Sequence, residues 1–197
     1  AETNPQAGSV AFKVSTIYNQ AMDTVRRNNE GASPILADLR KIEESAEDDN
    51  AMTDLFMWMH SEHGSPFFNA GPMEDFDDSN AYAMYVSGGG IGLGNRDYYL
   101  LDDERNTAIR NAYRTLIRQQ MINAGYSAGD AERIMENVMK IETSLAEETW
   151  SLEESRNIAA MKNPRSFTEL KKMYPVIDWD RFFVETMGIE SLDKVIV

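Results

Sequence analysis

Two long amphipathic segments joined by a short turn constrain the fold of this 197-residue chain most strongly. In the first segment, apolar residues recur at three- and four-residue steps between an N-cap at Asp102 or Asp103 and a stop at Gly125. Ser127 can cap the second segment, which has the same spacing. The short connection predicts two antiparallel neighbouring helices. Their predicted inward-facing residues are Ala108, Ile109, Ala112, Tyr113, Leu116, Ile117 and Met121, then Ala131, Ile134, Met135, Val138, Ile141 and Leu145.

Shorter helical patterns flank this pair. We expect helices over about residues 8–27 and 34–42, and a third from the acidic run 47–49 to about residue 63. Ser166-Phe167-Thr168-Glu169 is a capping-box pattern that predicts the start of another helix. A last helix is predicted to begin at Asp178 and to end at Gly188. The predicted buried face of the third helix holds Met52, Leu55, Phe56 and Met59.

Residues 66–94 have a different composition. Two aromatic-rich runs, 66–70 and 81–86, flank an acidic turn and predict a small antiparallel strand pair, and a glycine-rich loop follows. The apolar, β-branched residues 195–197 are typical of a strand. No linker or internal repeat separates two domains. We therefore expect a mainly α fold: one helical, bundle-like domain over residues 1–197, with long antiparallel helices and one small antiparallel strand pair, and a chain that is a fragment of a longer protein.

Composition excludes several classes of function. Nineteen basic against 33 acidic residues give a net charge of −14, which disfavours nucleic acid and direct membrane contact. The absence of cysteine excludes disulfides, Cys-ligated zinc, iron–sulfur clusters and thiol catalysis. The longest apolar run, residues 55–59, is far shorter than the roughly 20 residues that span a bilayer. No targeting segment is visible at the start, so we expect either a cytosolic protein or a leader outside this chain.

Three motifs suggest metal or nucleotide chemistry at first sight. His60 and His63 share a helix face, but the His-Glu-x-x-His pattern and a third ligand are absent, so we predict no metal site there. The glycines of residues 88–94 fit neither the dinucleotide fingerprint nor a P-loop, which favours a backbone turn close to a neighbouring element. The acidic turn lacks the Gly and Glu of an EF-hand, because Asn80 and Val86 occupy those positions. No catalytic or substrate-binding residue is assigned.

The run Gly90-Ile91-Gly92-Leu93-Gly94-Asn95-Arg96-Asp97-Tyr98-Tyr99 resembles a signature of the neprilysin and endothelin-converting-enzyme family of zinc metallopeptidases. That signature, Gly-Leu-x-Leu-x-x-Arg-Asp-Tyr-Tyr, belongs to the amino-terminal helical lobe of the family. The resemblance extends in order over roughly residues 12–197, through Ile17-Tyr18, Glu142-x-x-Leu145-Ala146 and Ile177-Asp178-Trp179. A structural role is expected for the matching residues Gly90, Gly92, Leu93, Arg96, Asp97, Tyr98 and Tyr99.

The resemblance implies a non-catalytic cover over a carboxy-terminal catalytic lobe of the same polypeptide, enclosing a chamber that admits short peptides. The zinc ligands and the general base would lie in that lobe, in His-Glu-x-x-His and Glu-x-x-x-Asp motifs that this chain lacks. The chain alone is therefore predicted to hold no cofactor and to be inactive, with zinc in the parent enzyme. Its partners would be the catalytic lobe and peptide substrates. Arg96 and Asp97 are expected in a buried or interlobe ion pair.

The missing cysteines suggest a bacterial member, since animal members are usually disulfide-rich. An exported protein is expected, periplasmic, cell-surface or secreted, with a cytoplasmic location as the alternative. Two other functions remain open from the sequence: a stand-alone helical interaction module, and an independent hydrolase that uses His60 or His63 with a carboxylate. If the chain is an isolated lobe, we expect an exposed apolar patch where the other lobe belongs.

Overall fold

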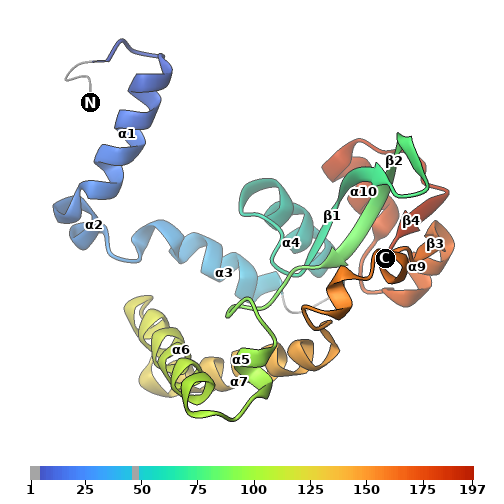
Figure 1. The fold of residues 1–197 in the computed structure, drawn as a ribbon. Helices are drawn as coiled ribbons and strands as arrows, with labels where there is room; N and C mark the ends of the chain where they lie inside the picture. The colour runs from blue at the N-terminus through green and yellow to red at the C-terminus, as the bar shows by residue number, and fades with distance from the viewer. Residues whose placement is uncertain (1–4, 46–48) are drawn as a thin grey trace.

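The computed structural model describes residues 5–45 and 49–197, and it is mainly α-helical with one small sheet (Figure 1). The helices and strands follow one another along the chain as α1 (Val10–Met22), α2 (Thr24–Glu30), η1 (Ser33–Ile35), α3 (Leu36–Glu44), α4 (Asp49–Glu62), β1 (Phe68–Asp75), β2 (Asp78–Gly88), α5 (Asp97–Leu100), α6 (Glu104–Asn123), α7 (Ala128–Glu148), η3 (Glu154–Arg156), α8 (Ile158–Met161), β3 (Pro164–Ser166), α9 (Phe167–Met173), α10 (Trp179–Met187) and β4 (Lys194–Ile196). The predicted fold class is confirmed.

The sheet is larger than the predicted strand pair. Its strand order is β1-β2-β4-β3, with β1 antiparallel to β2, β2 parallel to β4, and β4 antiparallel to β3. The hairpin and a terminal strand were predicted, but the joining of β4 to β2 was not, because a parallel pairing links residues far apart in the sequence. β3 was missed altogether, since its three residues begin with Pro164 and show no apolar alternation.

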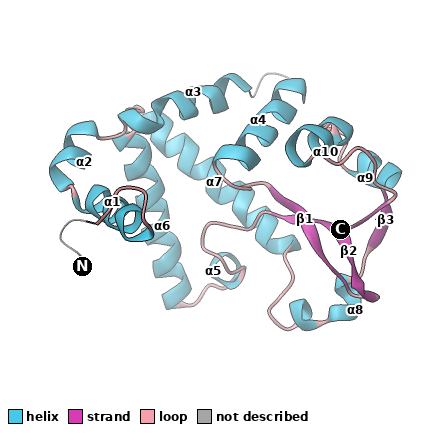
Figure 2. Cartoon of the chain, turned by 90° about the horizontal axis from the view of Figure 1, so that it is seen from above, coloured by secondary structure: helices cyan, strands magenta, loops and turns pink. Residues whose placement is uncertain are grey.

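The main core lies between the sheet and helices α4, α9 and α10, which Figure 2 shows on one side of the strands. Trp179, Phe182 and Phe183 of α10 are at most 1% exposed. Asp178 caps this helix by accepting from the Arg181 N–H, and Gly188 ends it in the left-handed conformation, with φ of 69°. The other buried members of the core are Phe56, Phe68, Met84, Val86, Leu170 and Val195. Of the predicted α4 face, Leu55 and Phe56 are fully buried, whereas Met52 and Met59 are half-buried.

The long helices α6 and α7 form the predicted hairpin, around a second core of Tyr99, Met135, Met139 and Ala146. Part of the predicted stripe is wrong, because Leu116, Ile141 and Leu145 are 52%, 60% and 49% exposed. Of the described residues, none that belongs to α6 is buried. The face of α7 that packs inward is offset from the predicted one and includes a charged residue, which the apolar pattern alone does not select.

The predicted first helix is divided in two. Asp23 ends α1 with non-helical backbone angles (φ −76°, ψ 78°), and its carboxylate accepts from the Arg26 N–H to cap α2. Gly31 follows α2 with a positive φ of 54°, which glycine adopts more readily than other residues, and its N–H donates to the Arg27 carbonyl. Together, α1, α2 and α3 form an arm whose far end stands apart from the α6–α7 hairpin and from the sheet (Figure 1).

The capping box at the start of α9 is present as predicted. Ser166 Oγ accepts from the Glu169 N–H at 3.2 Å, while Glu169 Oε2 accepts from the Ser166 N–H at 2.8 Å. The hydrogen bonds from the Ser166 side chain and backbone lower the pKa of Glu169. We expect Ser166→Ala to destabilise the chain by about 1 kcal/mol in urea unfolding, because N-cap removal has that typical effect. Ser144→Ala, at an exposed position within α7, is the control, and an equal effect of both would contradict the capping role.

Candidate functional site

The glycine-rich loop and the signature residues after it contact the α6–α7 hairpin. Gly90 and Gly94 have positive φ angles of 101° and 74°, which residues other than glycine rarely adopt. The Gly94 N–H donates to the Ile91 carbonyl at 2.8 Å and closes a tight turn between them. Short helix α5 follows immediately, and it places Tyr99 in the second core with 6% exposure. The loop therefore serves to bring the α5 tyrosines against α7.

Glu142 of α7 is the centre of this contact. One carboxylate oxygen accepts from the Gly92 N–H at 3.1 Å and from the Tyr113 hydroxyl at 3.2 Å. The other oxygen accepts from the Tyr99 hydroxyl at 2.7 Å. The Tyr99 oxygen in turn accepts from the Leu93 N–H at 2.9 Å. We call Gly92, Leu93, Tyr99, Tyr113 and Glu142 the carboxylate cluster. It joins the loop, α5, α6 and α7 through hydrogen bonds to one half-buried charge.

Close approach of the backbone explains two of the glycines. A Cβ built on Gly92 would lie 2.0 Å from the Tyr113 hydroxyl oxygen and 2.9 Å from Glu142 Oε1. A Cβ on Gly89 would lie 2.4 Å from the Pro66 carbonyl oxygen. Neither position has a positive φ, so the requirement for glycine at both is steric. This is the role that the sequence predicted for the glycine run, a backbone that passes close to a neighbour.

Arg110 of α6 holds the end of α5. Its guanidinium donates to the carbonyl oxygens of Tyr98 at 2.9 Å and Leu101 at 2.6 Å, and it pairs with Asp102 at 2.7 Å. The side chain is only 11% exposed. A cation at the C-terminal end of a helix satisfies carbonyl groups that lack partners within the helix. Arg110 therefore fixes the end of the signature while Glu142 fixes its loop.

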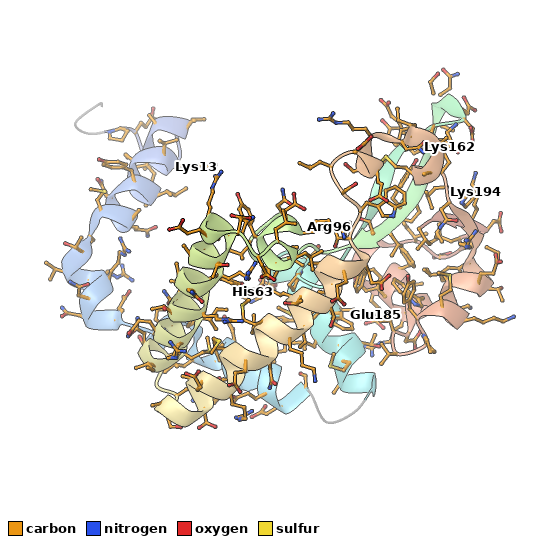
Figure 3. All side chains as sticks on the ribbon, turned by 60° about the horizontal axis from the view of Figure 1, so that its bottom comes forward. Lys13, His63, Arg96, Lys162, Glu185 and Lys194 are labelled. Carbon is orange, nitrogen blue, oxygen red and sulfur yellow. The ribbon has the colours of Figure 1, made fainter. Side chains whose placement is uncertain are left out.

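Arg96 and Asp97 do not pair with each other in the structure, and an interlobe ion pair of either residue stays a prediction. Arg96 lies beside Glu154 instead, with 3.8 Å between Nη1 and Oε2, and its place near the hairpin is labelled in Figure 3. Asp97 is exposed and is the first residue of α5. An acidic residue is favourable at this position because of the partial positive charge at the start of a helix. The two side chains are adjacent in sequence, yet they point to different surroundings.

Sequence reasoning predicted that Tyr113 faces inward but assigned no role to Arg110 or Glu142, although Glu142 carried a signal. Met135, Met139, Glu142 and Ala146 follow one another at steps of four, three and four residues, which is one face of a helix. A charged residue on the buried face of a helix needs hydrogen-bond partners. The partners are two hydroxyls and a backbone N–H that no single-sequence pattern brings together.

Burial and the neighbouring Glu142 carboxylate raise the pKa values of the Tyr99 and Tyr113 hydroxyls. For Tyr99, burial contributes most and the hydrogen bond to Glu142 comes next, and the pKa is raised well above its ordinary value. For Tyr113, burial and the Glu142 charge raise the pKa to about 12. The proton on each hydroxyl is thus held more tightly in the folded chain than in the unfolded one, whose tyrosines titrate near 10.

These shifts predict a loss of stability at high pH. The cluster's contribution is fully present below about pH 10 and is lost as pH rises through the folded-state pKa values, because the unfolded chain then binds fewer protons. We expect urea unfolding at pH 8 and pH 11 to show a smaller decrease for Tyr99→Phe than for the wild type. Tyr82→Phe, at a residue that is 76% exposed, is the matched control. An unchanged decrease in Tyr99→Phe would contradict the assignment.

The two histidines are engaged separately. Both ring nitrogens of His60 lie within hydrogen-bonding distance of carbonyl oxygens, at 2.8 Å from Phe56 and 3.0 Å from Phe68. His63 packs edge-on against Trp58, with Nε2 3.9 Å from the Asp38 carboxylate. In residues 5–45 and 49–197, no group of three or more His, Cys, Asp or Glu is placed to hold a metal ion. Although it lies near the end of α4, His60 is half-buried and packs against Phe68 and Phe182.

A groove of about 850 Å³ runs between α6 and α7. Met135 and Met139 line it together with polar side chains, and the Arg118–Glu132 ion pair joins the two helices there. No helix in the described parts of the chain is both long and apolar enough to cross a membrane.

Comparison with known proteins agrees with this architecture. The model of the amino-terminal part of peptidase family M13 matches residues 1–197. Neprilysin-1 of Caenorhabditis elegans is 28% identical over 199 residues, covering 92% of this chain and 26% of that protein. Human endothelin-converting enzyme 1 is 30% identical over 118 residues, covering 58% of this chain and 15% of its own length. The chain thus spans about a quarter or less of the length of these relatives.

Two solved bacterial structures share the fold. The zinc metalloprotease Zmp1 of Mycobacterium tuberculosis, in complex with an inhibitor, superposes with a TM-score of 0.80 at 23% identity, over 98% of this chain and 29% of that one. PepO of Lactobacillus rhamnosis superposes with a TM-score of 0.73 at 16% identity, over 88% of this chain and 27% of its own. Because the family model matches residues 1–197, this chain belongs to peptidase family M13 and corresponds to the amino-terminal lobe of the neprilysin-like zinc metallopeptidases in that family.

Proposed function

We propose that this chain is the non-catalytic amino-terminal cover of a zinc metalloendopeptidase, a single domain that lies over the catalytic lobe and restricts access to short peptides. The observation that carries the proposal is the family match along all 197 residues, none of which form the His-Glu-x-x-His motif. The cover contributes shape and access, and the carboxylate cluster contributes rigidity. Peptide-bond hydrolysis belongs to the parent enzyme.

Zinc is assigned to the part of the parent outside these residues. The residues present do not fit a zinc site, because both His60 nitrogens face carbonyl oxygens and His63 packs against Trp58. A catalytic zinc needs three protein ligands around an open position. We therefore derive no catalytic step within this chain. The parent is proposed to be an exported bacterial protein that has the catalytic lobe and peptide substrates as its partners.

The experiment compares the 197-residue chain with the product of its complete gene. We expect zinc and chelator-sensitive cleavage of a short peptide in the complete product, and neither in the 197-residue chain. The complete product should cleave a peptide of about ten residues while leaving the same sequence intact when it is embedded in a folded protein. Zinc and cleavage in the 197-residue chain, lost in His60→Ala or His63→Ala, would overturn the proposal in favour of an independent hydrolase.

One observation is equally compatible with the alternative, a stand-alone interaction module. Large apolar side chains are exposed over much of the chain, among them Tyr82 and Leu152 at 76% and 67%. Such surfaces mark contact sites for either another lobe or another protein. A complete gene that encodes no His-Glu-x-x-His after these residues would support the module and refute the cover.

A further inference from the structure

Helix α1 has an apolar face that the described residues leave uncovered. Val10, Val14, Ile17 and Tyr18 lie on one side of this helix at steps of four, three and one residues, and they are 78%, 62%, 67% and 62% exposed. Among the described residues, none that belongs to α1 is buried. Figure 1 shows this helix at the far end of the arm, away from both cores.

The charge content of α1 differs from that of the surface helices. Lys13, labelled in Figure 3, is the one charged residue among its 13, whereas α7 has eight among 21. On the side opposite Val10, roughly 200° around the axis at about 100° per residue, lies Phe12, which is 39% exposed. The other residues on that side are Lys13 and the uncharged polar residues Ser15, Thr16, Asn19 and Gln20, so α1 is an amphipathic helix with one apolar face. Because such a helix is stabilised mainly by packing of its apolar face, the side of Val10, Val14, Ile17 and Tyr18 is the one to be covered.

The comparisons favour an occupant from the same polypeptide. The open-state structure of Zmp1 matches 100% of this chain with a TM-score of 0.79, so an arm of this kind occurs in a chain about three times as long. The additional length of such polypeptides can supply a segment that covers the apolar face of α1.

We infer that α1 is an intramolecular docking helix, covered in the complete protein by an apolar, weakly charged helical segment of the same polypeptide that lies outside residues 1–197. This inference rests on the proposed function, and it adds the place of attachment: the arm α1–α2–α3 rather than the sheet or the α6–α7 hairpin. Val10, Val14, Ile17 and Tyr18 are the contact residues that the geometry assigns.

The absence of cysteine permits a direct test by thiol labelling. Ile17→Cys and Arg133→Cys are made separately in the 197-residue chain and in the complete gene product, with any further cysteines of that product replaced. Arg133, whose side chain is 64% exposed on the charged helix α7, is the matched control. We expect both introduced thiols to react rapidly in the 197-residue chain. In the complete product, the thiol of Ile17→Cys should react at least about tenfold more slowly than that of Arg133→Cys, because a covered site reacts only through local opening.

Equal reactivity of the two thiols in the complete product would overturn the inference. Protection of the Ile17→Cys thiol in the 197-residue chain that increases with protein concentration would also overturn it, and would identify a second copy as the occupant. If circular dichroism shows that Ile17→Cys prevents folding, Val14→Cys replaces it as the probe. Peptide cleavage is measured separately on the complete product. Cleavage with a reactive thiol at position 17 refutes the docking alone, whereas a protected thiol at that position without cleavage refutes the proposed peptidase.

Discussion

Replacing Gly92 by alanine is expected to destabilise the chain by about 3 kcal/mol, toward the upper end of the range for overpacking. The added methyl group would lie 2.0 Å from the Tyr113 hydroxyl oxygen and 2.9 Å from Glu142 Oε1, distances that require both side chains to move. Their movement disrupts the hydrogen bonds that Glu142 accepts from Gly92 and Tyr113. Urea unfolding should show a lower midpoint, and near-ultraviolet circular dichroism should show altered tyrosine packing.

Gly88→Ala is the matched control, because no atom lies within 4 Å of the Cβ that it introduces and its φ is not positive. We expect that variant to remain within about 0.5 kcal/mol of the wild type. A double-mutant cycle with Tyr113→Phe sharpens the test. Removing the hydroxyl should destabilise the wild type yet relieve part of the strain in Gly92→Ala. Additive effects of the two changes would contradict the contact between the residues.

The sequence alone predicted those parts of the structure that depend on local chemistry. The N-caps at Ser127 and Ser166, the left-handed glycine at Gly188 and the lengths of α6 and α7 follow from capping and periodicity within a few residues. The glycine run was correctly predicted to pass close to a neighbouring element, since no nucleotide motif fitted it. These features need no knowledge of what the distant parts of the chain contribute.

The remaining features depend on contacts between residues far apart in the sequence. β4 pairs with β2, which precedes it by about 110 residues in the sequence. With only three residues, β4 is too short to show an apolar periodicity. Glu142 meets Gly92 across 50 residues. The exposure of Ile141 and Leu145 arises because the described residues place no partner on that side of α7. Apolar periodicity shows that a helix face is to be covered, but it does not identify the element that covers it.

Phe182→Ala is expected to destabilise the chain by about 3–5 kcal/mol, the largest effect of a single substitution that we predict. Phe182 is fully buried, and its ring lies 5.0 Å from that of His60, 5.2 Å from that of Phe68 and 5.8 Å from that of Trp179, measured between centroids. Truncation removes these contacts and leaves a cavity between α4, β1 and α10. Because a domain is stable by only about 5–15 kcal/mol, the loss affects a large part of the total.

Phe76→Ala removes the same atoms from a ring that is 40% exposed, so its expected effect is about 1 kcal/mol or less. If Phe182→Ala does not fold, Phe182→Leu leaves a smaller cavity and should have an intermediate effect in urea unfolding. The carboxylate cluster belongs to the other core, so Tyr99→Phe and Phe182→Leu should have additive effects. Equal effects at positions 76 and 182 would refute the aromatic core as the main source of stability, and strong coupling to Tyr99 would show that the two cores unfold as one unit.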